Sequence, residues 1–298
     1  MAIFEGAGVA IVTPFKENNE VDFEKLGKMI DYQIDHGTDS IIVCGSTGEA
    51  STLTHEEHIE CIRQAVVFAN KRVPVIAGSG SNCTDTAIYL SQEAFRAGAD
   101  ALLVVSPYYN KGTQNGMMQH FTKIAQAVDI PMLLYNIPGR TGVNLLPKTI
   151  AELVRNVDNI VGVKSSVSDI SQVVEMMDFC NGEIDLYSGD DAVTLPYLSI
   201  GAKGVISVLS NIAPEDTHDM VMRFLHGDTK GSLELQLKYQ KLIKALFIEV
   251  NPIPIKEALE ICGWGPSVLR LPLTKMEQEN ALLLRQEMEK VAIQYVNI

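Results

Sequence analysis

Short runs of apolar and β-branched residues alternate along the chain with longer segments whose apolar residues recur at helical spacing. One such strand followed by one amphipathic helix takes roughly 30 residues, which is the length of a βα unit. The pattern therefore predicts a series of βα units. The predicted strands cover residues 8–13, 40–44, 73–77, 101–105, 132–135, 160–164, 184–187 and 204–207.

The helices between these strands are predicted from periodicity and from their end signals. The segment 23–36 carries Leu26 and Met29 on one apolar face, and Gly37 is suited to the position just after the helix. Thr54 and Glu57 have the spacing of a capping box and predict the start of the next helix. Further helices are predicted over residues 84–96, 116–128, from 147 onward, and over 170–180, 191–200 and 214–225.

Eight strands, each followed by a helix, predict an α/β fold of the (β/α)8 TIM barrel class. The alternative is a doubly wound open sheet, which near-equal units with polar residues at every strand exit disfavour. We expect the barrel to occupy residues 1–227 and a small C-terminal helical domain to occupy residues 228–298. In that domain the Pro-rich segment 251–254 interrupts the helices, and Thr274 and Glu277 open a last one. Its predicted apolar face consists of Leu284, Met288, Val291, Ala292 and Tyr295.

Composition narrows the class of protein. A net charge of −13 argues against a nucleic-acid partner, and an anionic substrate would have to be attracted by local Lys or Arg side chains. The five cysteines are odd in number and lack Cys-x-x-Cys spacing, which is typical of reduced thiols. We find no basic signal-peptide region and no run of ~18 apolar residues, so we expect a cytoplasmic protein without a membrane span.

In a (β/α)8 barrel the active site forms where the strands end. Lys164 ends the apolar strand 160–164, where it is either a solvated charge or an amine held at the mouth of an apolar interior. Hydroxyl groups dominate the other strand exits. The exits carry Thr13, Ser46, Thr47, Ser79, Asn82, Tyr108, Tyr109, Tyr135, Asn136, Ser188, Gly189, Asp190 and Ser207.

One lysine among hydroxyls suits Schiff-base chemistry, because an apolar setting favours the neutral, nucleophilic amine. Tyr135 is placed to transfer protons, with Ser46 and Tyr109 as possible relay members. The turn 45–48 offers NH groups and hydroxyls to a small carboxylate, and Arg140 offers a planar fork to a second one. Each feature also has a purely structural interpretation: an exposed strand end, a loop ion pair or an ordinary βα turn.

Two motifs are misleading. Gly78 and Gly80 lack the third glycine of the dinucleotide fingerprint, because Cys83 stands at its position. His55 and His58 are three residues apart, not four as in the zinc protease motif. We therefore expect neither a metal site nor a cofactor.

Together the motifs resemble the dihydrodipicolinate (4-hydroxy-tetrahydrodipicolinate) synthase family of the pyruvate-dependent class I aldolase superfamily. The likeness spans nearly the whole chain, in the family's order. The matching segments are Gly45-Ser46-Thr47-Gly48-Glu49, Ser106-Pro107-Tyr108-Tyr109-Asn110, Tyr135-Asn136-Ile137-Pro138-Gly139-Arg140-Thr141-Gly142, Gly162-Val163-Lys164, Ser188-Gly189-Asp190-Asp191, Gly204-Val205-Ile206-Ser207 and Asn251-Pro252-Ile253-Pro254-Ile255-Lys256.

The resemblance implies a barrel with a C-terminal helical domain, usually a homotetramer, acting in lysine and diaminopimelate biosynthesis. Lys164 would form a Schiff base with pyruvate, and the enamine would attack L-aspartate 4-semialdehyde. Tyr135 matches the proton-transfer tyrosine and Tyr109 the tyrosine that crosses a dimer interface. Ser46 stands where the family generally has Thr. The implied substrate-binding residues are Thr47, Arg140, Gly189 and Ile206.

Arg140 separates this interpretation from its nearest alternatives. Sialic acid lyases of the same superfamily share the Gly-Ser-Thr-Gly-Glu turn but lack this arginine, so N-acetylneuraminate lyase and 2-keto-3-deoxy sugar acid aldolase rank lower. A non-catalytic barrel that binds a keto acid or amino acid is a further alternative. Ser165 and Ser166 depart from the family's usual Glu-Ala.

Many members of the family are inhibited by lysine at a dimer interface. Matching positions here make up a possible lysine effector site. They are Ser51, His55, His58, Asn82 and Tyr108. Thr86 stands where inhibited members often carry an acidic residue for the amine of the effector, so inhibition stays open at this point.

Overall fold

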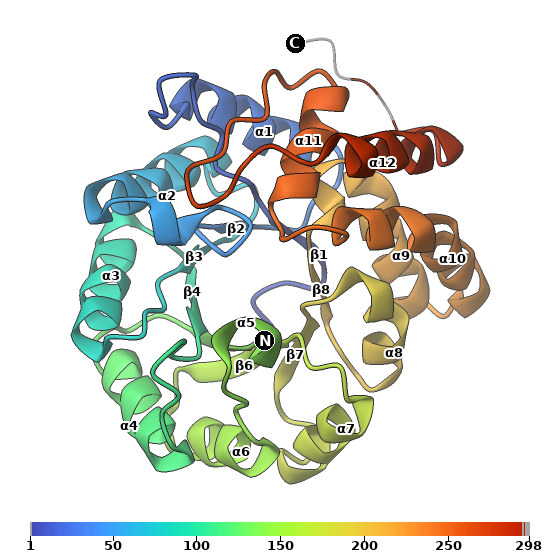
Figure 1. Cartoon of the computed structure of the whole chain (residues 1–298). Coiled ribbons are helices and arrows are strands. Elements are labelled where there is room, and N and C mark those ends of the chain that lie inside the picture. Colours follow the sequence, from blue (N-terminus) through green and yellow to red (C-terminus); the bar gives the residue numbers. More distant parts are fainter. Residues whose placement is uncertain (1, 294, 296–298) are drawn as a thin grey trace.

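Eight parallel strands close into a barrel in which each strand pairs with the next and β8 pairs with β1 (Figure 1). The computed structural model describes residues 2–293 and 295. The strands are β1 (Gly6–Ala10), β2 (Ser40–Val43), β3 (Val75–Gly78), β4 (Ala101–Val105), β5 (Met132–Asn136), β6 (Ile160–Ser165), β7 (Asp185–Ser188) and β8 (Gly204–Ser207). The predicted TIM barrel is thus confirmed, and the open sheet is excluded because β1 and β8 are paired.

Helices form the outer ring of the barrel, except the short α5, which lies over the barrel mouth (Figure 1). The helices up to the end of the barrel are α1 (Phe23–Asp35), α2 (His55–Ala69), α3 (Thr84–Ala97), α4 (Gln114–Ala125), α5 (Pro138–Thr141), α6 (Pro147–Asn156), α7 (Ile170–Phe179), α8 (Thr194–Ser199) and α9 (Pro214–Leu225). Thr54 and Glu57 form the predicted capping box at the start of α2, and Gly37 has a positive φ after α1. The apolar stripes of these helices face the strands and bury a continuous core.

A smaller cluster fills the inside of the barrel. It includes Phe4, Leu133, Tyr135, Tyr187 and Ile206. Successive side chains of a strand point to opposite faces, so each strand contributes to both the outer core and this inner cluster. The rings of Phe4 and Tyr187 in this cluster stack with centroids 4.5 Å apart. The barrel is therefore a packed body rather than a pore.

Some predicted bounds shift. Strand β1 begins and ends earlier than residues 8–13. The helix predicted over 191–200 is a 3₁₀ turn, η2 (Asp191–Val193), followed by the short α8. The pattern missed α5 and the 3₁₀ turns η1 (Ala50–Thr52) and η3 (Leu209–Asn211), because elements of three or four residues are too short to show a period.

Three further helices follow the barrel: α10 (Thr229–Leu246), α11 (Ile253–Ile261) and α12 (Gln278–Lys290). Leu284 and Met288 are buried as predicted, but the last helix does not extend to Val291, Ala292 or Tyr295. Ala292 has a positive φ of 54°, which right-handed helix cannot continue through, and Tyr295 is exposed. The boundary at 227/228 stays a prediction; α9 ends and α10 begins on either side of it.

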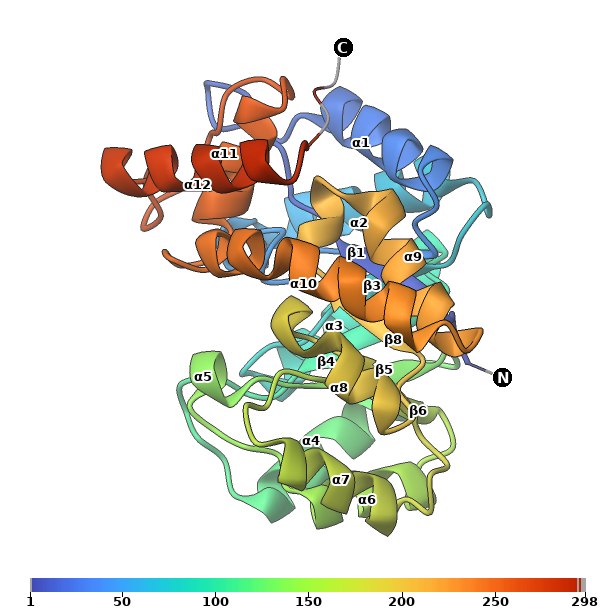
Figure 2. The same cartoon turned by 90° about the vertical axis from the view of Figure 1, so that its right-hand side faces the viewer.

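The side view separates the two ends of the barrel (Figure 2). The short α5, which follows the end of β5, lies on the same side as α11 and α12, whereas the N-terminus lies on the opposite side. The C-terminal helices therefore stand near the strand ends where chemistry is expected. Within the described part of the chain, no helix combines the length and apolarity that crossing a membrane requires.

Candidate active site

A cavity of about 450 Å³ opens at the carboxyl ends of β2 to β5, and residues of the C-terminal segment close part of it. It brings together seven of the thirteen predicted site residues. The predicted site residues in its lining are Ser46, Ser51, His55, His58, Tyr108, Tyr135 and Arg140. The cavity therefore extends from the predicted catalytic residues to those of the predicted effector site.

Lys164 lies beside this cavity on β6. It is buried, with 6% of its surface exposed, and it pairs in register with Tyr135 on β5. Its Nζ lies over the ring of Tyr135, 4.4 Å from the ring centroid. The amine thus sits against a ring that forms the cavity wall and does not extend into bulk solvent.

Gly189 lies against the stem of Lys164, and Ile206 lies in the apolar cluster inside the barrel. A Cβ on Gly189 would lie 3.0 Å from Cε of Lys164 and 2.2 Å from Oγ of Ser166, so only glycine fits there. Ile206 is fully buried in the inner cluster with Tyr135. The Oγ of Ser166 donates a hydrogen bond to the Gly189 carbonyl at 3.0 Å, which gives the unusual serine a structural role.

Tyr187 is a neighbour of Lys164 that the sequence did not single out. It pairs in register with Lys164 from β7 and is fully buried. Its hydroxyl donates to the carbonyl of Phe4, which precedes β1, at 2.8 Å. Burial raises the pKa of this phenol, so it stays protonated. Tyr187 is therefore the strand neighbour of Lys164 and remains a neutral phenol whose proton is bonded to Phe4.

The two predicted carboxylate contacts meet at Asn251, between α10 and α11. The side-chain Nδ2 of Asn251 donates to Oγ1 of Thr47 at 2.9 Å, and both residues are buried. Arg140 donates from Nη2 to the main-chain carbonyl of Asn251 at 2.7 Å. From the sequence, Asn251 was recognised only as part of a helix break and of a family motif. Its contact with both residues emerges from the structure.

A buried ion pair lies at the end of the turn that follows β2 and carries Thr47. Glu49, which has a positive φ of 51°, pairs with Lys256 of α11, and the two side chains are 1% and 5% exposed. The Nζ of Lys256 also lies 4.1 Å from the ring centroid of Phe15. Burial lowers the pKa of Lys256 to about 8, against the opposing effect of the Glu49 carboxylate.

Arg270 adds a second tie between the C-terminal segment and the rim. It donates to both carboxylate oxygens of Glu57 on α2 and to the carbonyl of Thr52. This bonding holds the pKa of Glu57 below its usual value and that of Arg270 above its own. Together with the Glu49–Lys256 pair, these bonds hold the turn after β2 against the C-terminal helices.

Tyr109 and Asn82 are not brought into the cavity by this chain. Tyr109 is 87% exposed, and its backbone has a positive φ of 72°. The main-chain carbonyl of Asn82 accepts from the side chain of Asn110 at 2.8 Å. Tyr109 therefore lies away from Lys164 within one chain.

His58 is constrained among the predicted effector residues. Its Nε2 donates to the Gly78 carbonyl at 2.7 Å, which assigns the proton to that nitrogen. Burial lowers its pKa, so the ring is neutral at pH 7. His55, in contrast, lies at the start of α2 with its ring 5.8 Å from that of Tyr89. Of the two, His55 is the freer to meet a ligand.

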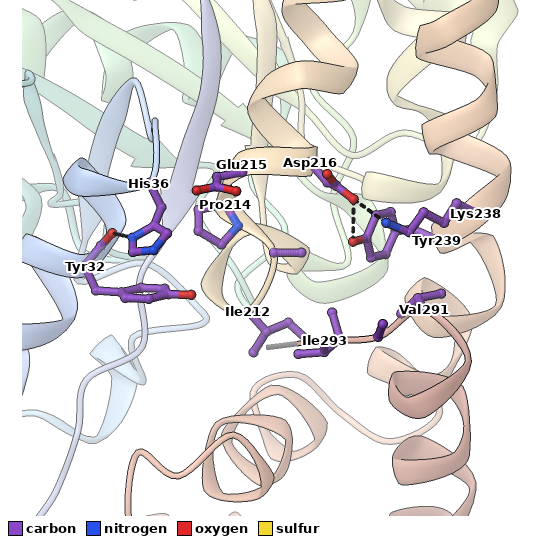
Figure 3. Close-up of a pocket in the computed structure, with 12 residues that line it drawn as sticks. Tyr32, His36, Ile212, Pro214, Glu215, Asp216, Lys238, Tyr239, Val291 and Ile293 are labelled. Atoms are coloured by element: carbon purple, nitrogen blue, oxygen red, sulfur yellow. Dashed lines mark hydrogen bonds and ion pairs between the residues drawn. The ribbon is translucent and has the colours of Figure 1, made fainter. Parts of the chain in front are cut away.

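A second hollow of about 150 Å³ lies on the outside of the barrel between α1, α9, α10 and the segment after α12 (Figure 3). Lys238 and Tyr239 both donate to Asp216 there, at 2.6 and 2.7 Å. Asp216 is thus paired with its two neighbours, and none of the predicted site residues lines this hollow. Over residues 2–293 and 295, no three His, Cys, Asp or Glu side chains cluster in a way that could hold a metal ion.

Comparison with known proteins shows which family the chain belongs to. The model of the dihydrodipicolinate synthetase family matches residues 3–291. The chain belongs to the dihydrodipicolinate synthetase family.

Relatives within this family are similar over their full length. The chain is 63% identical to the 4-hydroxy-tetrahydrodipicolinate synthase of Lachnoclostridium phytofermentans, covering 98% of this chain and 100% of the relative. The dihydrodipicolinate synthase of Aquifex aeolicus superposes with a TM-score of 0.96 at 44% identity, over 99% and 100% of the two chains. That of Cyanidioschyzon merolae, solved with lysine bound, has a TM-score of 0.95 at 40% identity, over 98% and 99%.

Proposed function

We propose that the chain is a lyase, a 4-hydroxy-tetrahydrodipicolinate synthase, that condenses pyruvate with L-aspartate 4-semialdehyde through a Schiff base on Lys164. The observation that carries this proposal is the buried Nζ of Lys164, 4.4 Å from the ring centroid of Tyr135 at the wall of the cavity. Full-length identity of 63% to a synthase supports the substrates. The reaction belongs to lysine and diaminopimelate biosynthesis.

The chemistry begins at the amine. Neutral Nζ adds to the ketone carbon of pyruvate, water leaves from the carbinolamine, and a methyl proton is lost to give the enamine. Its carbon then attacks the aldehyde, and the amino group of the semialdehyde closes the ring as Nζ departs. Tyr135 is the proposed proton carrier, with Ser46 and Tyr109 as relay members.

Recognition of two carboxylates needs two separate contacts. We assign the pyruvate carboxylate to Thr47 and the semialdehyde carboxylate to Arg140, which borders the cavity. Gly189 leaves room beside the stem of Lys164, and Ile206 gives the pocket an apolar side. Since the net charge is −13, local cations and hydrogen-bond donors are needed to attract the substrate carboxylates.

Reduction with borohydride tests the covalent step. With pyruvate present, we expect one reduced pyruvate adduct on Lys164 and none in Lys164→Arg; absence of the adduct from the wild-type protein would refute the mechanism. Arg140→Ala should still trap pyruvate but lose at least tenfold in kcat/KM for the semialdehyde. Turnover of a keto-deoxy sugar acid in preference to the semialdehyde would favour the sugar-acid aldolases instead.

We further propose a homotetramer in the cytoplasm. A Tyr109 side chain that is 87% exposed supports an interface at which it reaches the cavity of a partner. Sedimentation at micromolar concentration should give a single species of four chains. A monomer with full activity would contradict the role given to Tyr109.

Lysine is the proposed effector, at Ser51, His55, His58, Asn82 and Tyr108. Four of these line the cavity, and a related synthase has been solved with lysine bound. Thr86 also lines the cavity but supplies no negative charge for the ammonium group, so we expect weak inhibition. Unchanged initial rates at millimolar lysine would dispose of this assignment.

A further inference from the structure

Asn251 joins the two residues to which the proposed function assigns the substrate carboxylates. Its side chain donates to Thr47 at 2.9 Å and its main-chain carbonyl accepts from Arg140 at 2.7 Å. It also borders the cavity, and 5% of its surface is exposed. One residue of the C-terminal segment thus contacts both anion-binding side chains of the barrel.

The direction of the bond to Thr47 matters for chemistry. A threonine hydroxyl has one proton to donate and two lone pairs that accept. Because the amide N–H of Asn251 occupies a lone pair, the proton of Thr47 remains available to a carboxylate oxygen. The hydroxyl is thereby oriented before the substrate arrives, and such preorganisation lowers the cost of binding.

The other polar atom of the Asn251 side chain, Oδ1, is buried and has no hydrogen-bond partner among the described residues. An unpaired buried acceptor costs stability, which an apolar side chain of similar size would avoid. The bond to Thr47 is therefore the polar interaction that accounts for an amide at this position.

Neighbouring contacts hold Asn251 where it is. The segment continues into α11, whose Lys256 forms the buried ion pair with Glu49 at the end of the Thr47 turn. The carbonyl of Asn251 is itself fixed by Arg140. The amide and the hydroxyl are therefore anchored from both sides of their hydrogen bond.

We propose that Asn251 is a positioning residue for the keto acid: it orients the Thr47 hydroxyl so that this group donates to the pyruvate carboxylate. The inference rests on the proposed function. It assigns to the C-terminal helical segment a part in substrate binding that the barrel alone does not supply.

Side-chain variants separate the two contacts, because they keep the main-chain carbonyl that Arg140 uses. Asn251→Ala should raise KM for pyruvate about tenfold, the equivalent of one hydrogen bond. Asn251→Asp should raise it further, since a carboxylate accepts the Thr47 proton and repels the anion. KM for the semialdehyde should stay within about twofold in both. Asn159→Ala is the matched control: that amide donates to three carbonyls away from the cavity, so both KM values should stay unchanged.

A double-mutant cycle tests whether Asn251 acts through Thr47. In a Thr47→Val background, Asn251→Ala should change KM for pyruvate less than twofold; additive losses would overturn the proposal. So would an unchanged KM in the two single variants, or equal rises for both substrates.

The borohydride trap distinguishes this failure from failure of the proposed function. If wild-type protein traps no pyruvate, the Schiff-base function itself is wrong. If it does, and the variants trap pyruvate at the same half-saturating concentration, only the role of Asn251 is lost. Should Asn251→Ala not fold, Asn251→Asp takes its place in the cycle, and a Thr47→Val variant with unchanged KM for pyruvate would overturn the proposal as well.

Discussion

Replacing Lys256 by Met is expected to destabilise the protein strongly. The ammonium group of Lys256 is the buried partner of Glu49, and the two side chains are 5% and 1% exposed. Removing it leaves a carboxylate in the interior whose remaining bond is the one that Oε2 accepts from the main-chain N–H of Arg270 at 3.2 Å. Breaking one side of such a buried pair costs about 3–5 kcal/mol.

The size of the effect can be expressed as a melting temperature. Unfolding entropies near 2.1 cal/mol/K per residue give roughly 0.6 kcal/mol/K for a chain of 298 residues. A loss of about 3–5 kcal/mol therefore lowers Tm by about 5–8 °C, if the chain unfolds as one unit. Scanning calorimetry of wild type and Lys256→Met measures it directly.

The matched control removes both charges. In Glu49→Gln/Lys256→Met no ion remains buried, and replacement of a whole buried pair is often close to neutral. We expect this double variant to recover most of the lost Tm. A single variant within 1 °C of wild type, or a double variant no better than the single one, would refute the idea that an unpaired Glu49 is the cause.

Two further predictions concern stability away from the site. The hydrogen bond to Asp39 raises the pKa of His218. The stability lost in His218→Gln should therefore be largest below pH 6.5 and should shrink as pH rises through the folded-state pKa. Urea unfolding at pH 5.5 and at pH 8.5 measures this loss, and equal losses at the two pH values would argue against the ion pair. Gly204→Ala should cost about 1–3 kcal/mol in the same assay, because its Cβ would lie 1.9 Å from the Gly6 carbonyl oxygen where β8 meets β1, whereas Gly112→Ala, with open space around it, should be nearly neutral.

Local patterns were sufficient for the eight strands and the longer helices, but not for the elements of three or four residues. Strands β4 and β8 and helix α9 have the predicted bounds, because period-2 and period-3.6 patterns are properties of neighbouring residues. The end of α12 was misplaced, since apolar residues at the right spacing continue past the backbone conformation of Ala292 that ends it. Periodicity reports which residues are apolar, not where the backbone turns.

The contact between Lys164 and Tyr135 could also be predicted from the sequence. Parallel strands of a barrel all end at one rim, so residues at successive strand exits must become neighbours once the fold class is known. The register of β5 and β6 pairs the two residues directly. The structure adds the burial of the amine and the distance to the ring.

Contacts between the C-terminal segment and the rim were decided by the tertiary structure alone. Asn251 and Thr47 are 204 residues apart, and Lys256 and Glu49 are similarly distant, so no local pattern connects them. In sequence, residues 251–256 show only a proline-rich break and a lysine. Which strand end they cover depends on how α10 and α11 pack back over the barrel. That packing depends on many apolar contacts between residues far apart in the sequence, and these contacts exist only in the folded chain.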